Sequence, residues 1–482
     1  MSWESVIGIE VHVELATESK MFCGCAVSFG EEPNTNVCPV CLGLPGAIPV
    51  PNRKAIDWIM EIGLALNCEV SPRSVFHRKN YFYADLPKNY QISQFDVPVC
   101  HDGHLEVTLD GETTTVGIER AHMEEDTGKS THVGDGGRIH AATATLLDFN
   151  RSGVPLVEIV SKPDIRSAAE ARAYAQELRS LVAELGVSDA RLEEGSLRFD
   201  ANVSVRPEGQ DELGVKVEIK NMNSFRSLER AVDFEIARQI EVLESGGELI
   251  QETRHWEEEA GVTHSMRTKE GSSDYRYFTE PDLVPMVMDA EWVDEVRERL
   301  PELPADRRRR YGLVGLDPAN AEILSAAPAE LRSVFDEALL AGAPPKPAAN
   351  WLTGEVTAWM RRTETEPGDL GLTGGQLAEL VAIVEEGTVS SSAAKDVLEG
   401  VLDGEGDPRA VAESRDLVQI SDALALEKVV EEVLAANPDA VESFRNGEQK
   451  VVGFLVGQVM RATQGKADPK MVNELLRTGL SS

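Results

Sequence analysis

The stretch Ile7-Gly-Ile-Glu-Val-His-Val-Glu-Leu15 places an apolar side chain at every second position. A two-residue period predicts a β-strand that buries one face and exposes the other. The exposed face of this strand would carry Glu10, His12 and Glu14. Groups of this kind, about 7 Å apart along a strand, can share a divalent cation or relay a proton. A solvated network of ion pairs is the alternative interpretation.

Further segments repeat this pattern, and helices are expected between them. Residues 197–205 and 215–219 alternate in the same way, so they predict strands with one charged face. A helix is expected from Ser167 to Leu185, with a Ser167-x-x-Glu170 capping box and Gly186 as its end. A second helix is expected over 227–245, before a glycine pair. Because strands and helices do not alternate regularly, the pattern favours an α+β fold on a largely antiparallel sheet.

The chain is expected to divide into three parts. Residues 1–290 mix strands and helices, and no strand pattern follows Trp292. Residues 291–330 predict connecting helices, and residues 331–482 predict an all-helical region. Pro344-Pro-Lys-Pro347 is expected to be a rigid break, and Asp403-Gly-Glu-Gly-Asp407 a hinge.

Composition restricts the environment and the partners. The 482 residues carry a net charge of −36, spread along the chain, and arginine outnumbers lysine. This composition favours a salt-rich cytoplasm over an ordinary acidic protein. It also means that binding to nucleic acid requires local basic patches. We expect no signal peptide and no membrane span, and therefore a cytoplasmic protein.

Four of the six cysteines are clustered, as Cys23-x-Cys25 and Cys38-Pro-Val-Cys41. Two such pairs can enclose one tetrahedral ion, and thiolates favour zinc. Four protein ligands leave no open position, so the expected role is structural. Four reduced cysteines without an ion, or a redox pair, are the alternatives. The clustering does not fit a secreted disulfide framework.

Several acidic residues could join Glu10 and His12 in one metal site. The candidates are Glu124 and Glu125, together with Glu158 and Glu218. Hard oxygen ligands suit Mg²⁺ held jointly with substrate phosphates. Bases from other parts of the chain could then neutralise a transferred phosphoryl group. The candidates are Arg151, Arg198, Lys216 and Lys220.

Two apparent motifs are rejected, and two unusual segments are retained. Gly128-Lys-Ser130 lacks the glycine that a P-loop needs five places earlier. Gly271-Ser-Ser273 lacks the flanking glycines of a nucleophile elbow. Residues 77–93 and 266–278 interleave basic and aromatic side chains. Such segments can stack on bases or clamp phosphates; an aromatic-anchored loop is the alternative.

Eight stretches follow one another along the chain. They are Ile7–Leu15, Asn34–Gly46, Arg78–Tyr83, Leu86–Gln94, Glu124–Lys129, Asp148–Leu156, Glu218–Phe225 and Asp274–Phe278. In this order they resemble the GatB family, the B subunits of aspartyl/glutamyl-tRNA amidotransferases. The resemblance covers the whole chain. It implies a cradle-shaped catalytic domain followed by helical domains, with a YqeY-like tail that contacts tRNA.

The resemblance also implies an activity. Such a protein would use ATP and Mg²⁺ to phosphorylate the side-chain carboxylate of misacylated Asp-tRNA(Asn) or Glu-tRNA(Gln). A partner, the amidase subunit, would release ammonia from glutamine. The ammonia would pass through an internal tunnel and displace phosphate, and a third, small subunit would brace the pair. The assembly would thus be a ligase that forms a carbon–nitrogen bond.

Individual roles follow from the resemblance, position by position. The catalytic and metal-binding residues would be Glu10, His12 and Glu125, with Glu124, Glu158 and Glu218 as further magnesium ligands. Contacts to ATP or to the acyl phosphate would be Lys79, Lys88, Arg151, Asn202, Lys220 and Asn221. The four clustered cysteines match the zinc knuckle of the family. The tail would present Lys450, Arg461, Lys466 and Lys470 to the tRNA backbone.

The sequence departs from the family pattern at a few positions and leaves one rival. Glu14 stands where glutamine is commoner, so it adds a charge beside the site. Asn89 replaces a glycine, and Ala84 and Thr279 replace prolines, without removal of a reactive group. The rival is a zinc-bearing RNA-binding scaffold whose carboxylates form only ion pairs. The sequence leaves open whether Asp-tRNA, Glu-tRNA or both are substrates.

Overall fold

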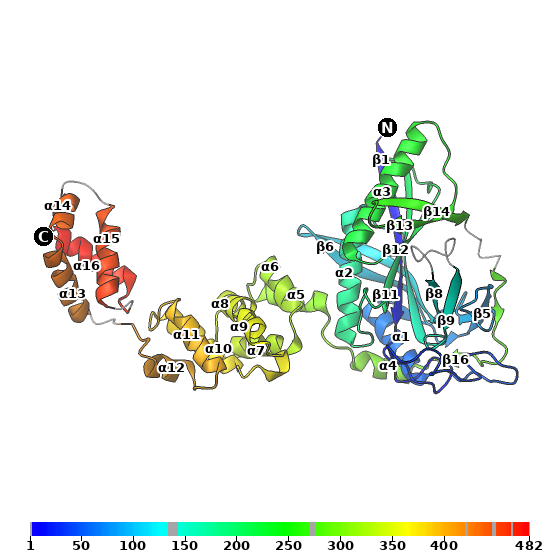
Figure 1. The fold of residues 1–482 in the computed structure, drawn as a ribbon, viewed down its shortest axis with the longest axis horizontal. Helices are drawn as coiled ribbons and strands as arrows, with labels where there is room; N and C mark the ends of the chain where they lie inside the picture. The colour runs from blue at the N-terminus through cyan, green and yellow to red at the C-terminus, as the bar shows by residue number, and fades with distance from the viewer. Residues whose placement is uncertain are drawn as a thin grey trace. The chain divides into compact units, whose positions relative to one another are not determined.

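The computed structural model describes residues 2–133, 143–268, 275–419, 423–445, 450–463 and 466–481. The chain forms two compact units, Met1–Ala305 and Asp306–Ser482. Figure 1 shows a large sheet in the first unit and helices in the second. The rejected Gly271-Ser-Ser273 motif lies outside the described residues. The expected domain boundaries near 290 and 330 stay a prediction.

A nine-stranded sheet organises the first unit. Its order is β14-β13-β12-β11-β1-β10-β7-β6-β2. The strands are β1 Trp3–Glu14, β2 Glu69–Val70, β6 Cys100–Leu109, β7 Glu112–Glu125, β10 Pro155–Ser161, β11 Leu197–Pro207, β12 Val217–Met222, β13 Glu252–Glu257 and β14 Val262–Thr268. Neighbours pair antiparallel, except β12 with β13, which are parallel. The predicted α+β fold with a largely antiparallel sheet is therefore confirmed.

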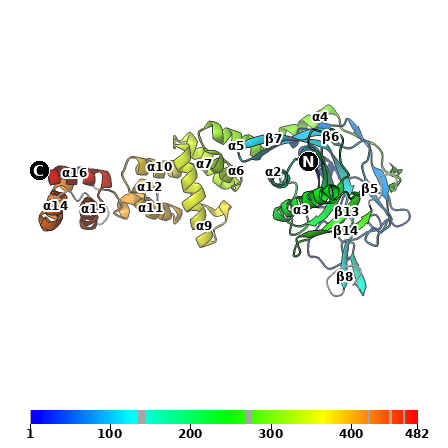
Figure 2. The ribbon, with the colours of Figure 1, turned by 90° about the horizontal axis from the view of Figure 1, so that it is seen from above.

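Smaller sheets lie beside the large one. A three-stranded sheet has the order β15-β4-β5, a second pairs β16 with β3, and a third pairs β8 with β9. Their bounds are β3 Arg73–Ser74, β4 His77–Asn80, β5 Tyr90–Ser93, β8 Lys129–Val133, β9 Ala144–Asp148, β15 Phe278–Thr279 and β16 Met286–Val287. Gly128 leads into strand β8, not into the helix that a P-loop requires. Figure 2 shows β8 at the margin of the first unit.

The core of this unit lies between the sheet and three helices. Ile7, Ile9, Val11 and Val13 are all fully buried, so the alternation predicted for β1 is confirmed. The helices α1 (Arg53–Ala65), α2 (Ala168–Leu185) and α3 (Phe225–Glu244) contribute the facing side chains of the same core. Helix α3 packs against β11 and β12, and Figure 1 shows it beside these strands. The polar side chains of β1 project from the opposite face of the sheet.

One predicted strand position is wrong. Val215 is 40% exposed and precedes β12, which begins at Val217. The physical reason is the neighbouring Gly214, where an added Cβ would lie 2.2 Å from the carbonyl oxygen of Val205. At Gly214 the chain therefore passes very close to the end of β11, and regular pairing with β11 begins only at Val217.

The two predicted helices end where their caps place them. The Ser167 hydroxyl accepts a hydrogen bond from the Glu170 N–H, and Gly186 ends α2 in the left-handed conformation at φ +66°. The Glu170 carboxylate accepts from the Arg166 N–H, so the expected capping box is displaced by one residue. Helix α3 begins two residues before the expected start because Ser224 is its N-cap.

The second unit is helical throughout the part that the structure describes. Helix α4 (Ala290–Glu298) still belongs to the first unit, and α5 (Pro304–Leu313) crosses the boundary between the units. The elements that follow are α6 Pro318–Ser325, α7 Ala329–Leu340, α8 Pro345–Asn350, a π-helical turn Trp351–Val356, α9 Thr357–Thr363, a 3₁₀ turn Pro367–Asp369, α10 Gly374–Glu385, α11 Ala393–Leu402, α12 Pro408–Ser414, α13 Ala423–Ala436, α14 Pro438–Arg445, α15 Val451–Ala462 and α16 Pro469–Ser481. Pro345 begins α8, where a missing N–H costs nothing. No described helix is long and apolar enough to cross a membrane.

Two separate apolar cores stabilise these helices. One is built from residues between Tyr311 and Ala412, and the other from residues between Leu426 and Leu480. The expected hinge at Asp403–Asp407 connects α11 and α12, which belong to the same core. Glu405 in this connection forms an ion pair with Arg415. A hinge at this connection stays a prediction.

We predict that Leu178→Ala lowers the free energy of unfolding by about 2–5 kcal/mol, because Leu178 on α2 is fully buried against the sheet and truncation leaves a cavity. Gln176→Ala, at an exposed position of the same helix, should change it by less than about 0.5 kcal/mol. Circular dichroism during urea unfolding measures both. Equal effects of the two variants would contradict the packing described for α2.

Candidate active site

Strand register places four ionisable side chains in one row across the sheet. His12 on β1 lies opposite Arg198 on β11 and opposite Glu158 on β10. Glu158 lies in turn opposite His122 on β7. Directly paired residues project from the same face of a sheet. Here it is the face opposite the one that α1, α2 and α3 cover. The row therefore reads Arg198, His12, Glu158, His122.

The first group with the geometry of a cation site lies within and beside this row. His12, Glu124 and Glu158 each offer one ligand atom, and these atoms lie within 4.8 Å of one another. The Nε2 atom of His122 is 3.5 Å from both Glu124 Oε1 and Glu158 Oε2. Glu124 reaches the group because it follows His122 by two residues on β7 and so shares its face.

A second group has only oxygen ligands. Glu10, Asp200 and Glu218 again place one atom each within 4.8 Å of the others. The ammonium of Lys220 lies 2.5 Å from Asp200 Oδ2 and 3.4 Å from Glu218 Oε1. The amide of Asn202 donates a hydrogen bond of 2.8 Å to Glu10 Oε1. The predicted ligands Glu10 and His12 are thus both near acidic partners, but in two different groups.

Glu125 lies outside both groups in the described part of the chain. Its carboxylate forms an ion pair with Lys88 and accepts a hydrogen bond of 2.8 Å from the Ile92 N–H. It follows Glu124 directly along the chain, so alternation turns it to another side. Its role as a metal ligand or catalytic residue therefore stays a prediction, as does the phosphate contact expected of Lys88.

Neighbouring bases keep the acids of the first group ionised. Burial opposes ionisation of Glu158, but His122 and His12 outweigh it and hold the pKa of this carboxyl well below its ordinary value. Burial likewise opposes ionisation of Glu124, but Lys79, 3.3 Å away, lowers its pKa to about 2. Both side chains are therefore carboxylates at neutral pH, the form that binds cations.

Asp126 forms a third ionic cluster at the edge of the site. Burial disfavours its charged form, but Arg198 at 3.0 Å and Arg151 at 3.6 Å lower its pKa. Arg151 also donates to the carbonyl oxygens of Thr127 and Gly128, at 3.1 Å each. Burial and the neighbouring Asp126 raise the pKa of Glu14 to about 8. Glu14 is thus uncharged at neutral pH, and the extra charge expected from the sequence is absent.

Members of these clusters line a cavity of about 390 Å³, which we call the cradle cavity. Its lining is His12, Lys79, Tyr81, Gln91, Glu124, Asp126, Thr127, Leu156, Arg198, Asp200, Lys220 and Asn221. Three predicted phosphate contacts, Lys79, Lys220 and Asn221, are therefore on its wall. The volume is typical of a small-molecule site.

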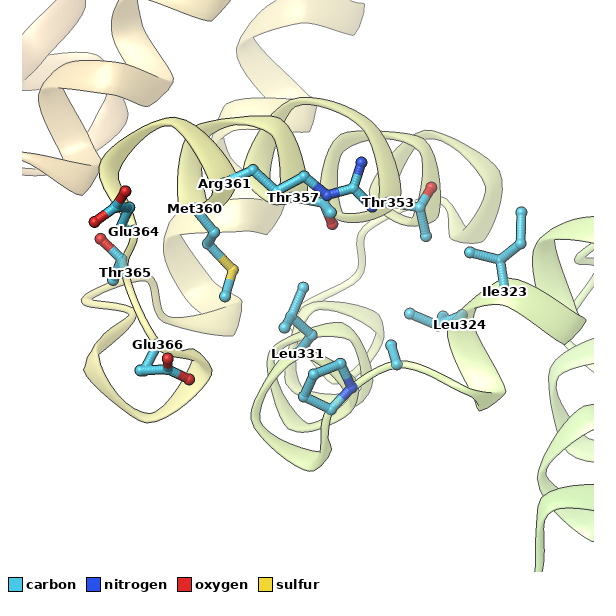
Figure 3. Close-up of a pocket in the computed structure, with 12 residues that line it drawn as sticks. Ile323, Leu324, Leu331, Thr353, Thr357, Met360, Arg361, Glu364, Thr365 and Glu366 are labelled. Atoms are coloured by element: carbon cyan, nitrogen blue, oxygen red, sulfur yellow. The ribbon is translucent and has the colours of Figure 1, made fainter. Parts of the chain in front are cut away.

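A second cavity, in the helical unit, has a different chemical character. It measures about 410 Å³, and its wall includes Leu324, Leu331 and Met360. Figure 3 shows Leu331 and Met360 projecting into the same space, with Glu364 and Glu366 at one end. None of the metal-ligand groups found among the described residues lies in this unit. The cradle cavity is therefore the candidate for acid–base and phosphate chemistry.

The four clustered cysteines converge as the spacing predicts. Their sulfur atoms lie within 4.8 Å of one another, and the Cys38 and Cys41 sulfurs are 3.9 Å apart. A hydrogen bond from Cys23 lowers the pKa of Cys41 to about 4. This group fits one tetrahedral zinc ion in its donor type and number, with Cys25 as the fourth ligand.

The cysteine loop is joined to the loop that carries Arg151. The Asn34 N–H donates to Asp148 Oδ1 at 3.0 Å, and the Asn36 N–H donates to Asn150 Oδ1 at 2.8 Å. Gly153 adopts φ +89° where an added Cβ would contact the Cys41 side chain at 3.5 Å. The cysteine cluster thus helps to fix Arg151 beside Asp126.

Sequence reasoning missed two members of the site, His122 and Asp200. Arg120, His122 and Glu124 alternate along β7 in the way that Glu10 and His12 alternate along β1. That shared period is a signal that could have identified His122. In the sequence, Asp200 is only one of several charged residues on an alternating strand. Its position opposite Glu10 depends on strand register, which the sequence does not give.

The basic residues predicted for the tail lie on its last two helices or next to them. Lys450, Arg461 and Lys470 are exposed. Lys466 forms an ion pair with Asp416. Their binding to tRNA stays a prediction.

Comparison with known proteins gives consistent matches along nearly the whole chain. The family model of the GatB/GatE catalytic domain matches residues 5–294, and the model of the GatB domain matches residues 333–480. The chain belongs to the GatB family. A relative from Moorella thermoacetica, named as the B subunit of aspartyl/glutamyl-tRNA(Asn/Gln) amidotransferase, is 52% identical over 100% of both chains. Relatives of the same name from Carboxydothermus hydrogenoformans and Geobacter sulfurreducens are 50% and 49% identical over 99% of both chains.

The GatB matches include every part of the site. The catalytic-domain match contains the cradle cavity and the four cysteines, and the second match contains the four basic tail residues. The resemblance inferred from the eight stretches is confirmed as membership of the GatB family.

We predict that Glu14→Gln stabilises the protein more at about pH 9 than at about pH 5. The folded pKa of Glu14, about 8, exceeds the ordinary value of 4.5, so wild-type stability declines as pH rises from about 4.5 to about 8. Glutamine cannot ionise, so the variant avoids that decline of at most a few kcal/mol. Melting temperatures at both pH values measure it, with Glu112→Gln at an exposed position of β7 as control. An equal shift at the two pH values would contradict the raised pKa.

Proposed function

We propose that this chain is the GatB component of a glutamine-dependent tRNA amidotransferase, a ligase that works on misacylated tRNA. Membership of the GatB family and the names of its relatives support the activity. The observation that carries the assignment of the site is the cradle cavity, whose wall contains members of both ligand groups and two lysines. The members are His12 and Glu124 of the first group and Asp200 of the second. The chain would act with an amidase subunit and with a third, small subunit.

The reaction needs an activated carboxylate. A side-chain oxygen of Asp or Glu on the tRNA attacks the γ-phosphorus of ATP, and ADP leaves. The product, an acyl phosphate, has a good leaving group where the carboxylate had none. Ammonia, released by the amidase subunit and delivered through a tunnel, then attacks the carbonyl carbon and phosphate leaves. The result is Asn-tRNA(Asn) or Gln-tRNA(Gln).

The donor sets of the cavity fit magnesium. Glu10, Asp200 and Glu218 provide the oxygen atoms that Mg²⁺ prefers, and His12, Glu124 and Glu158 provide a second, mixed group. The buried Oδ1 atom of Asn202 has no hydrogen-bond partner in the described part, so a cation ligand would satisfy it. Bound Mg²⁺ would neutralise phosphate oxygens during transfer.

The protein's own bases would orient the reactants. Lys220 and Asn221 line the cavity together with Asp200 of the all-oxygen group, so they suit the phosphates of ATP. Lys79 and Arg198 lie nearer the first group, where they suit the carboxylate that is phosphorylated. Burial disfavours the charged form of Lys220, but Asp200 and Glu218 raise its pKa, so it is cationic at neutral pH.

The rival function is a non-catalytic, zinc-bearing RNA-binding scaffold. The ion pairs of Lys79 with Glu124 and of Lys220 with Asp200 agree with it, because the acids already have partners. It predicts tRNA binding without ATP turnover.

We predict that Glu124→Gln lowers tRNA-dependent release of phosphate from ATP at least about 100-fold, because it removes a charge from the first ligand group. The purified three-subunit complex, supplied with Asp-tRNA(Asn) or Glu-tRNA(Gln), provides the assay. Glu112→Gln, at an exposed position of the same strand, is the matched control and should be fully active. Phosphate release unchanged in Glu124→Gln would remove this site assignment. No release by wild type with either tRNA would favour the scaffold.

We propose that the cysteine cluster holds one zinc ion. We predict that Cys38→Ser abolishes the bound zinc and lowers the melting temperature, because the cysteine loop is bonded to residues 148–150. Cys68→Ser, at a buried cysteine outside the cluster, should retain one zinc per chain. Elemental analysis by mass spectrometry measures the metal content. Purified wild type without zinc would show that the four thiols are simply reduced.

A further inference from the structure

We propose that the unpaired 3′ end of the charged tRNA reaches the cradle cavity across a file of aromatic rings, and that Arg276 binds its phosphate backbone there. The aromatic file consists of Tyr83, Tyr81, Tyr275, Tyr277 and Phe95. This inference rests on the proposed function, since it names how the tRNA substrate is positioned at the same site.

Each ring of the aromatic file touches the next. Ring centroids are 5.9 Å apart for Tyr83 and Tyr81, and 6.0 Å apart for Tyr81 and Tyr275. Tyr275 and Tyr277 are 6.0 Å apart, and Tyr277 stacks on Phe95 at 4.4 Å with an interplanar angle of 10°. Two segments far apart in the sequence thus form one continuous aromatic surface.

This surface connects solvent with the cavity. Tyr83 is 53% exposed and Phe95 is 47% exposed, so both ends of the file reach solvent. Tyr81 lies on the wall of the cradle cavity, and Lys79 Nζ lies 5.4 Å from the ring centroid of Tyr275. Phe82, next to the file, is 71% exposed, which is unusual for a large apolar side chain. The structure offers more aromatic area here than internal packing uses.

Arg276 lies between the third and fourth rings in an unfavourable conformation. Its φ of +46° is rare for a residue other than glycine. The Asn80 side chain holds it by donating to the carbonyl oxygens of Tyr275, at 3.1 Å, and of Arg276, at 2.9 Å. Such a conformation persists only where the surrounding structure enforces it, and here the Asn80 hydrogen bonds do so. The strained turn presents an exposed arginine beside the rings.

The charge of Arg276 also lacks a partner within the described residues. No ion pair links it to a carboxylate there, in a chain of net charge −36. Lys79 lies near the ring of Tyr275 and forms an ion pair with Glu124. Arg78 and Lys88 lie near the ring of Tyr90, outside the file, and also form ion pairs with glutamate. Among the described residues, Arg276 is therefore a base of this region that remains available for an anion from outside.

A single-stranded RNA end matches these features together. Its bases can stack on aromatic side chains, and its phosphates need a cation. The amino acid esterified to its last ribose must enter the cavity for the proposed reaction, so the nucleotides before it must lie on the way in. A protein partner could also cover the exposed rings and pair a carboxylate with Arg276, but the RNA is favoured because the proposed reaction already requires its end in the cavity that Tyr81 lines.

Steady-state kinetics of the three-subunit complex test the proposal. Tyr83→Leu should raise KM for charged tRNA about tenfold, since stacking of one base contributes about 5- to 150-fold in affinity. Tyr83→Phe, which keeps the ring, should restore the wild-type value. In both variants kcat and KM for ATP should stay near wild type.

Arg276→Gln tests the phosphate contact separately. It should weaken tRNA binding and reduce the slope of log affinity against log salt concentration by about 0.7, the value for one contact to a single strand. Arg73→Gln, at an exposed position of β3, and Phe29→Leu, at an exposed aromatic ring of the cysteine loop, are the matched controls and should leave both quantities unchanged.

The outcomes separate this proposal from the proposed function. An active wild type whose KM for tRNA is unaffected by Tyr83→Leu and Arg276→Gln would overturn the aromatic file and leave the function intact. Loss of the amidase subunit from the purified variants would also overturn the aromatic file, because it would show that the rings contact a protein partner. A wild type that binds tRNA but releases no phosphate would contradict the function, while the salt slope would still decide the role of Arg276.

Discussion

The site depends on the pairing of β1 between β10 and β11. Ionised groups taken out of water need opposite charges nearby, or they cost several kcal/mol each. Antiparallel register supplies these partners, because it places Arg198, His12, Glu158 and His122 side by side on one face. A slip by one residue would turn every one of them into the apolar core. The buried side chains of β1, which share one core with α1, α2 and α3, resist that slip.

The cysteine cluster extends the same principle beyond the sheet. A loop without regular structure cannot hold an arginine rigidly by itself. Here the loop that carries Arg151 is bonded through Asp148 and Asn150 to residues Asn34 and Asn36, which lie just before two of the four cysteines. A bound ion would fix both loops at once. The cysteine cluster therefore acts on the site through position, since its thiols are not part of the cradle cavity.

The sequence predicts local features well and long-range neighbours poorly. Alternation identifies β1 and β11, and caps identify the ends of α2, because both depend on adjacent residues. Register does not follow from such patterns, so the possible magnesium ligands could not be sorted into two groups. Parity along β7 could have separated Glu124 from Glu125, and it could have revealed His122. The neutral state of Glu14 could not have been inferred, since it arises from burial beside Asp126, which comes from a segment far along the chain.

The charge balance of the cavity limits how it can attract its substrates. Lys79, Arg198 and Lys220 lie 3.3, 3.0 and 2.5 Å from a carboxylate, so their charges are largely neutralised by the protein. With a net charge of −36 around it, such a cavity would repel ATP and RNA alike. Attraction must then come from bound metal ions or from basic side chains that have no acidic partner. Two acidic groups with the geometry of cation sites would answer this need for the phosphates of ATP. An exposed arginine beside aromatic rings, with no ion pair among the described residues, would answer it for RNA. An acidic protein can in this way bind two polyanions, provided that its few available positive charges stand where phosphates must pass.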